Sequence, residues 1–378
     1  MTMFRAAIAW HVFALTHSPF HLGLIGLVQF IPALGLTLLG GAVADTYERR
    51  RVIMLAQIVP LLTAVALFGL TRSGLVTLPI IYALILLVST AAAFDSPSRA
   101  ALLPTLVSRD FFPRAVTIAS TAQALAFVSG PAAGGLIIAE SGVGAVYATY
   151  GTLILGALGM LACIHSRPAG ASQRAVSWQA IRDGLAFVRR QPVILGCMTL
   201  DMFAVIFGGA NALLPVYAND ILHVGARGYG LLTASLDLGA LCTSLTLIAL
   251  PPLRRAGRTL LLAVAAYGLA TIVFGLARWF PVSVLAYIAV GVADQVSVVM
   301  RSTAIQLSTP DELRGRVSAV NFIFIGASNQ LGAVESGFVA ALTNAPFAVV
   351  SGGVGCLIVL AVVTVTLPQL RHYRIDRA

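Results

Sequence analysis

The feature that most constrains this chain is a series of long apolar stretches separated by short polar segments. Of its 378 residues, 58% are hydrophobic and only 10% are charged, whereas about a quarter of the residues in a typical soluble domain are charged. Each stretch is long enough to cross the roughly 30 Å hydrocarbon layer of a bilayer as an α-helix. The sequence therefore predicts an all-α polytopic membrane protein.

The hydrophobic pattern predicts about eleven complete spans and one partial span. The complete spans lie near residues 20–43, 52–71, 76–103, 114–138, 143–164, 194–218, 226–250, 259–278, 280–304, 315–343 and 346–367. The opening run, Ala6–Leu15, is too short to cross alone. We interpret it as the back half of a twelfth helix, and we expect a shortened N-terminus rather than an eleven-helix design.

The arginines predict the orientation of these spans. All 24 basic residues are arginine, and most lie in alternate loops and in the C-terminal tail. By the positive-inside rule those loops and the C-terminus are cytoplasmic, and we expect a bacterial inner membrane. A net charge of +10 would suggest a nucleic-acid partner in a soluble protein. Because the arginines lie between spans, we expect the lipid bilayer as partner instead, with no nucleic acid.

The longest loop divides the chain into two similar halves. We predict an N-terminal bundle over 1–164, a cytoplasmic linker with an amphipathic helix over 165–193, and a C-terminal bundle with a short tail over 194–378. The segments SRDFFPRAV and TPDELRGRV occupy equivalent places in the two halves. Two bundles of six helices joined by a cytoplasmic linker are typical of a transporter built from parallel repeats.

Two motifs resemble signatures of the major facilitator superfamily. The stretch GGAVADTYERRRVI contains the glycine, aspartate and basic cluster of the loop between helices 2 and 3, although Glu48 and Thr46 replace the usual glycine and basic residue. The stretch SGPAAGG resembles the helix 5 signature of the antiporter branch. The residues are Gly41, Asp45, Arg49 and Arg50 in the first motif, and Gly130, Pro131, Gly134 and Gly135 in the second. The superfamily's arginine inside helix 4 is absent.

Three further stretches are similar to the enterobactin-exporter-like group of bacterial efflux proteins: FDSPSRAALLPTLVSRD, LLPVYANDIL and RSTAIQLSTPDELRGRVSAV. The resemblance covers residues 12 to 370. It implies the major facilitator fold and a secondary active exporter. We expect this exporter to be a proton antiporter. The transported molecule would be small and moderately hydrophobic, such as a siderophore or a macrolide.

The resemblance also implies a gate at the cytoplasmic ends of the helices. In the family the loop arginine pairs with an acid of helix 4, and the loop aspartate faces the start of helix 11. Carried over, Asp45, Arg49 and Asp95 would hold the two halves together when the cytoplasmic side is closed. Asp45 and Arg49 are four residues apart and so share a helical face. The alternative is that these charges only set the topology.

Four acids lie inside the predicted spans of the second half: Asp201, Asp237, Asp294 and Glu335. An ionised carboxylate near the bilayer centre costs on the order of 2.5–3.5 kcal/mol, so such residues normally face a bundle interior or water and mark proton pathways. We expect them to take part in proton coupling. Asp294 and Arg301 are seven residues apart on one helical face, where a structural ion pair is the alternative to a functional one.

The polar residues of the spans predict a binding site near the bilayer midplane. Glu335 shares a stripe with Asn321 and Ser328, at a spacing of seven. Asp201 shares its face with Gly208 and Pro215, a line that can bend. Candidates for the substrate cavity are Gln29, Gln123, Asn211, Asn321, Ser328 and Asn329.

Other functions remain open at this point. One is an uncoupled facilitator or importer of the same fold, and another is a truncated membrane protein that does not transport. No clustered nucleophile, metal-ligand set or GxxxxGK[ST] phosphate loop is present in the sequence. We therefore expect no enzyme activity, no cofactor and no metal, and we expect a monomer.

Overall fold

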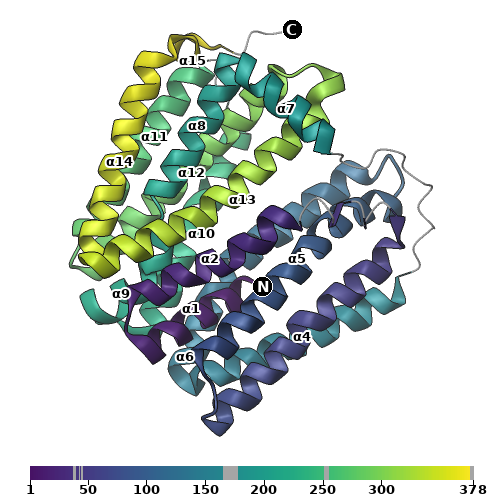
Figure 1. Cartoon of the computed structure of the whole chain (residues 1–378), viewed down its shortest axis with the longest axis vertical. Helices are drawn as coiled ribbons and strands as arrows, with labels where there is room; N and C mark the ends of the chain where they lie inside the picture. The colour runs from purple at the N-terminus through teal and green to yellow at the C-terminus, as the bar shows by residue number, and fades with distance from the viewer. Residues whose placement is uncertain (37–39, 42, 44–45, 165–177, 251–254, 375–378) are drawn as a thin grey trace. The chain divides into compact units, whose positions relative to one another are not determined.

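The computed structural model describes residues 1–378 except 37–39, 42, 44–45, 165–177, 251–254 and 375–378. Within those described residues the regular elements are all helical, and none is a strand. Nine of the described helices are long and apolar enough to cross a membrane. The prediction of an all-α polytopic membrane protein is thus confirmed (Figure 1).

The helices follow the predicted spans closely. They are α1 (Thr2–Thr16), α2 (Pro19–Gly35), α4 (Arg49–Ser73), α5 (Leu78–Leu106), α6 (Phe112–Cys163), α7 (Trp178–Arg190), α8 (Pro192–Phe207), α9 (Leu214–Val216), α10 (Gly225–Ala249), α11 (Ala256–Leu276), α12 (Phe280–Leu307), α13 (Asp311–Leu342), α14 (Ala345–Thr366) and α15 (Pro368–His372). The long α6 has a break at Gly142, whose φ of 80° and ψ of 171° are not helical. Glycine tolerates this conformation because it has no Cβ, so α6 comprises two spans with a break where the sequence predicts one.

The span predicted over 194–218 corresponds to one candidate span, Pro192–Ile221, but it is not one continuous α-helix. The α-helix α8 ends at Phe207 and is followed by a 3-10 turn, Ala210–Leu213, then by α9 and a π-helical turn, Tyr217–Ile221. The hydroxyl of Tyr267 donates to the carbonyl oxygen of Gly208 at 3.2 Å. Pro215 also lacks the N–H that a continuous helix would use. Both features take backbone groups out of the regular helical ladder.

The chain forms two compact units. Unit 1 contains Met1–Leu15 and Val28–Ser177. In it α4 packs against both α5 and α6, and α1 contributes the buried side chains of Phe4, Val12 and Phe13. The ring of Phe4 stacks on that of Tyr150 in α6, with centroids 4.5 Å apart.

Unit 2 contains Thr16–Leu27 and Trp178–Ala378. In it α11 packs between α12 and α14, α10 packs on α12, and α8 packs on α13 and α14. The first part of α2 belongs to this unit because Gly23 lies against Gly337 of α13, and the rings of Phe20 and Phe338 are 4.8 Å apart. The sequence-based division at residues 1–164 places this segment with the first bundle instead.

The amphipathic helix α7 packs at one end of unit 2. Gly184 lies against the backbone of Arg316 in α13, and the Arg316 guanidinium donates to the Asp183 carboxylate at 3.0 Å. Val188 is buried in the core of the unit, whereas Arg189 and Arg190 are exposed. Val188 is thus buried while the two arginines that follow it are exposed, and the amphipathic helix at the membrane surface stays a prediction.

Candidate transport site

In the described part of unit 2 one ion pair is buried, between Asp201 of α8 and Arg301 of α12. Both side chains are largely inaccessible, with 8% of Asp201 and 3% of Arg301 exposed. The pairing differs from the alternative in which Arg301 would pair with Asp294. Residues seven apart on a helix are separated by about 10.5 Å along its axis, whereas α8 packs directly against α12.

Asp237 and Asp294 lie on either side of a close crossing between α10 and α12. A Cβ atom at Gly239 would meet the backbone of Ile288 and Val292, and one at Gly291 would meet the backbone of Leu236. The helices can approach this closely because glycine has no side chain. Both carboxyl groups are half-buried, and they are near enough to interact electrostatically. Two tyrosines lie within electrostatic range of these acids, Tyr267 near Asp294 and Tyr287 near both.

Glu335 lies in α13, where the hydroxyl of Ser336 donates to its carboxylate at 3.2 Å. Ser328, two turns earlier, is fully buried and donates to the carbonyl oxygen of Phe324 at 2.6 Å. Asn321 is half-buried. The stripe is therefore polar throughout, but the hydroxyl of Ser328 is used inside its own helix.

The proposed gate residues of unit 1 are bound to neighbouring groups. The Arg49 guanidinium donates to the carbonyl oxygen of Ala101 at 2.8 Å, and Asp95 pairs with Arg99 at 2.6 Å. In the described residues Arg49 and Asp95 do not pair with each other. Nε of Arg49 and Oδ1 of Asp95 are both buried without a hydrogen-bond partner. Asp45 lies outside the described residues, so the gate stays a prediction.

The other charges of the same loop stabilise helix ends. Arg50 donates from Nε and Nη2 to the carbonyl oxygens of Leu161 and Ala162 in the last turn of α6, at 3.0 and 2.6 Å. Carbonyls at a helix C-terminus have no partner inside the helix, and a cation is favourable there. Glu48 pairs with Arg51 at 2.6 Å.

The glycines of the SGPAAGG motif pack against the start of α1. A Cβ at Gly130 would meet the side chain of Thr2, and one at Gly134 would lie 3.0 Å from Cγ of Met3. Pro131 and Gly135 are also buried in this helix, α6. The motif thus provides a closely packed contact within unit 1.

The predicted cavity amides differ in their exposure. Gln123, Asn211 and Asn329 are exposed and Gln29 is half-buried. The side-chain amide of Asn329 donates to the carbonyl oxygen of Ile325 at 2.8 Å. Their contact with a substrate stays a prediction.

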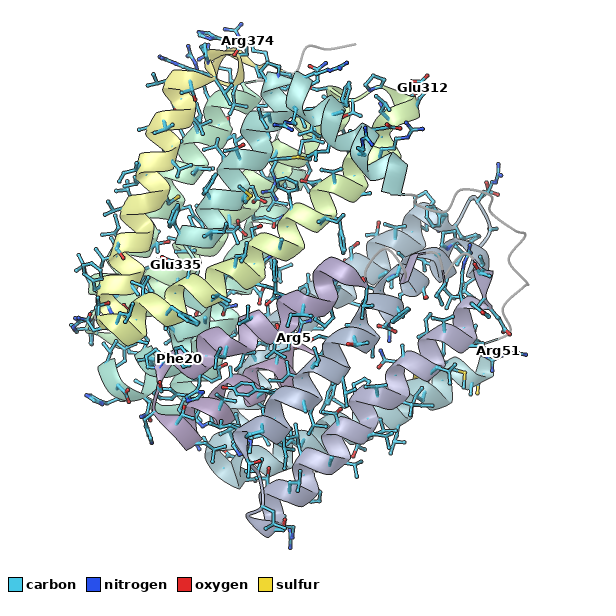
Figure 2. All side chains as sticks on the ribbon, in the orientation of Figure 1. Arg5, Phe20, Arg51, Glu312, Glu335 and Arg374 are labelled. Atoms are coloured by element: carbon cyan, nitrogen blue, oxygen red, sulfur yellow. The ribbon has the colours of Figure 1, made fainter. Side chains whose placement is uncertain are left out.

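Arg5 is a residue that the sequence reasoning missed. It lies one turn from the start of the apolar helix α1, where Figure 2 labels it, and its side chain is exposed. The signal that could have found it is a single arginine within the run MTMFRAAIAWHVFAL, a position that positive-inside topology does not explain.

Within the described part of the chain, no cluster of three or more His, Cys, Asp or Glu side chains could hold a metal ion. The cysteines Cys163, Cys197, Cys242 and Cys356 are free.

Comparison with known proteins gives a consistent result. The model of a family described as transmembrane secretion effector matches residues 1–376. The enterobactin exporter EntS of Escherichia coli (strain K12) is 29% identical over 374 residues, which is 97% of this chain and 88% of that protein.

Solved transporter structures share the fold. A bacterial homologue of the human lysosomal transporter Spinster superposes with a TM-score of 0.74 at 14% identity, covering 100% of this chain and 96% of the other. The nucleoside transporter NupG gives a TM-score of 0.71 at 14% identity, covering 98% and 97%. The predicted major facilitator architecture is confirmed by these likenesses.

Proposed function

Because this chain belongs to the transmembrane secretion effector family, and is a multi-pass membrane transporter of the major facilitator type, we propose that it exports a small molecule in exchange for protons. The exported molecule is moderately hydrophobic and able to form hydrogen bonds, as a siderophore is. The relationship to the enterobactin exporter supports this class of substrate.

One observation carries the proposal of proton coupling. Of the four acids inside the spans of unit 2, Asp201 is neutralised by Arg301, whereas Asp237, Asp294 and Glu335 form no ion pair in the described residues. Ionisable groups within spans are expensive and usually functional. These three carboxyl groups are therefore the ones that would take up and release protons.

The paired arrangement of Asp237 and Asp294 favours these two over Glu335. They lie on α10 and α12 beside a close crossing, where Gly239 and Gly291 each contact the backbone of the other helix. Because two nearby carboxylates repel one another, the gain or loss of one proton changes the force between the helices that carry them. Proton binding would then alter the packing of α10 on α12, which is the kind of change that alternating access requires.

The driving force is of the right size for this role. One proton that enters down a membrane potential of 100 mV supplies about 2.3 kcal/mol, before any pH difference is counted. That energy corresponds to an accumulation ratio of roughly fifty for an uncharged substrate exchanged with one proton.

The arginine-rich ends of the spans contain the proposed gate, consisting of Asp45, Arg49 and Asp95. The buried and unpartnered atoms Nε of Arg49 and Oδ1 of Asp95 support it, since groups left without partners in one conformation can find them in another. By the positive-inside rule this gate and the C-terminus are cytoplasmic, in the inner membrane of a bacterium.

The experiment that tests the proposal is uptake of enterobactin into everted membrane vesicles, with and without an imposed pH gradient. An antiporter accumulates the compound when the vesicle interior is acidic and stops when an uncoupler is added. Vesicles that contain the Asp237→Asn/Asp294→Asn variant should lose this dependence, while Arg72→Gln, at an exposed arginine in the last turn of α4, should behave as the unchanged protein.

Two other results would favour the alternatives. Downhill flux that ignores the gradient would indicate a facilitator or importer. Binding without movement of a panel of siderophores and macrolides would indicate a protein that does not transport.

A further inference from the structure

We propose that Arg5 binds an acidic group of the transported molecule, so that the substrate is an organic acid with a carboxylate or a similar anionic group. The inference rests on the proposed export function, because it assigns the chemistry of the substrate of that same transporter. Its evidence is separate, however, since it comes from unit 1 and from α1.

The first step concerns depth in the membrane. Helix α1 ends at Thr16 and α2 begins at Pro19, so the short connection between them lies at one membrane surface. Arg5 is eleven residues before Thr16, and a helix rises 1.5 Å per residue, which places Arg5 about 16 Å below that surface. The hydrocarbon layer is roughly 30 Å thick, so Arg5 lies near its middle. Transporters of this class bind substrates at that level.

The second step concerns charge. Arginine cannot lose its proton in proteins, and a cation at this depth is expensive unless it meets an anion or water. Among the described residues no acid forms an ion pair with Arg5, and no side-chain hydrogen bond from its guanidinium is made. Its exposed side chain contrasts with Arg301, the buried arginine of α12, which is neutralised by Asp201. Arg5 is thus a membrane-embedded cation whose anion is missing.

The third step concerns the surroundings of Arg5 within unit 1. Tyr150 of α6 lies within electrostatic range of Arg5. Phe4, which precedes Arg5 in the chain, stacks its ring on that of Tyr150, with the ring centroids 4.5 Å apart. The pair Asp95–Arg99 of α5 is within electrostatic range of the same tyrosine. Because Asp95 is matched by Arg99 at 2.6 Å, it leaves the charge of Arg5 uncompensated.

The chemistry of the guanidinium defines the ligand further. Its planar fork presents N–H donors that match the two oxygens of a carboxylate, and such charge-assisted bonds are stronger than neutral ones. The anion must also be small enough to approach a group on a helix that packs against α6. A carboxylate, catecholate or comparable group on a small organic molecule meets these conditions.

The test compares two probes that differ only in charge, salicylate and its neutral carboxamide, salicylamide. Binding to the purified full-length protein in detergent is measured by saturation-transfer NMR, which detects weak ligands. We expect the unchanged protein to bind salicylate at least about tenfold more tightly than salicylamide. In Arg5→Gln the affinity for salicylate should fall to that for salicylamide, while the affinity for salicylamide should stay the same.

Two further variants keep the test independent of folding. Arg5→Lys retains the charge and should retain most of the preference for salicylate, whereas Arg72→Gln, at an exposed arginine in the last turn of α4, should leave both affinities unchanged. A wild-type protein without preference for salicylate, or an Arg5→Gln protein that keeps the preference, would overturn the proposal. This experiment measures binding, whereas the export proposal is tested by flux. Proton-driven flux without a preference for salicylate would overturn the Arg5 proposal alone, and a preference for salicylate without flux would overturn the export proposal alone.

Discussion

The buried ion pair between Asp201 and Arg301 allows the most detailed prediction. The side chains are 10% and 4% exposed, respectively, so neither charge can be solvated by water when its partner is removed. Breaking a buried pair by removing one partner costs about 3–5 kcal/mol, because an uncompensated charge remains. Asp201→Asn should therefore destabilise the protein strongly.

The two single substitutions should not be equal. In Asp201→Asn the guanidinium of Arg301 stays charged, since arginine does not deprotonate. Its Nε atom already lacks a hydrogen-bond acceptor, and its Nη1 atom would lose the carboxylate that it contacts. In Arg301→Met the remaining carboxyl group can become neutral by taking up a proton, which limits the loss. We expect Asp201→Asn to be the more destabilising change.

The double variant Asp201→Asn/Arg301→Met should recover much of the loss. It leaves no charge in the site, and replacement of a buried pair by neutral groups is often close to neutral in stability. The cycle of single and double variants isolates the coupling between the two residues.

The assay is thermal unfolding of the purified protein in detergent. For a cooperative unit of roughly 200 residues, 3–5 kcal/mol corresponds to about 6–20 °C in Tm. Arg51→Gln provides the control, because it breaks the Glu48–Arg51 pair, in which the arginine side chain is 80% exposed, and exposed pairs contribute about 0–1 kcal/mol. Single variants that melt within about 1 °C of the unchanged protein, with no recovery in the double variant, would refute the reasoning.

Three further predictions follow from other parts of the molecule. Gly291→Leu should destabilise unit 2 by at least about 1–3 kcal/mol, because the added side chain would meet the backbone of Leu236. Gly69→Leu is the control, since nothing lies within 4 Å of a Cβ added there, and it should change Tm by a few degrees at most. Equal Tm values for the two variants would contradict the close crossing. Arg316→Gln should lower stability by less than about 1 kcal/mol, since its pair with Asp183 is half-exposed; a larger loss in thermal unfolding would show that α7 depends on this pair. Glu335→Gln should leave proton-driven enterobactin uptake largely intact while Asp237→Asn reduces it, and the reverse order in everted vesicles would reassign the proton carrier to α13.

Much of the fold follows from hydropathy because the bilayer imposes a length on every span. The run predicted over 76–103 corresponds to α5 at Leu78–Leu106, and the run over 346–367 to α14 at Ala345–Thr366. The break inside α6 at Gly142 was also predictable, since the hydrophobic pattern stops there. The interruption after Phe207 was not, because it depends on how Tyr267 of another helix reaches the backbone of Gly208.

The candidate site shows a second limit of sequence reasoning. Periodicity places residues on a face of one helix, but it does not say which helix that face will meet. Asp294 and Arg301 share a face, yet the carboxylate that reaches Arg301 comes from α8. The crossing of α10 and α12 at Gly239 and Gly291 likewise depends on tertiary packing that the sequence does not specify.

The most direct test of the central claim is proton movement in proteoliposomes that contain a trapped pH-sensitive dye. A downhill gradient of enterobactin is imposed across the membrane, and the internal pH is followed. The account predicts that protons move in the direction opposite to the compound, and that Asp237→Asn/Asp294→Asn abolishes the pH change. Movement of enterobactin through the unchanged protein at constant internal pH would contradict proton antiport.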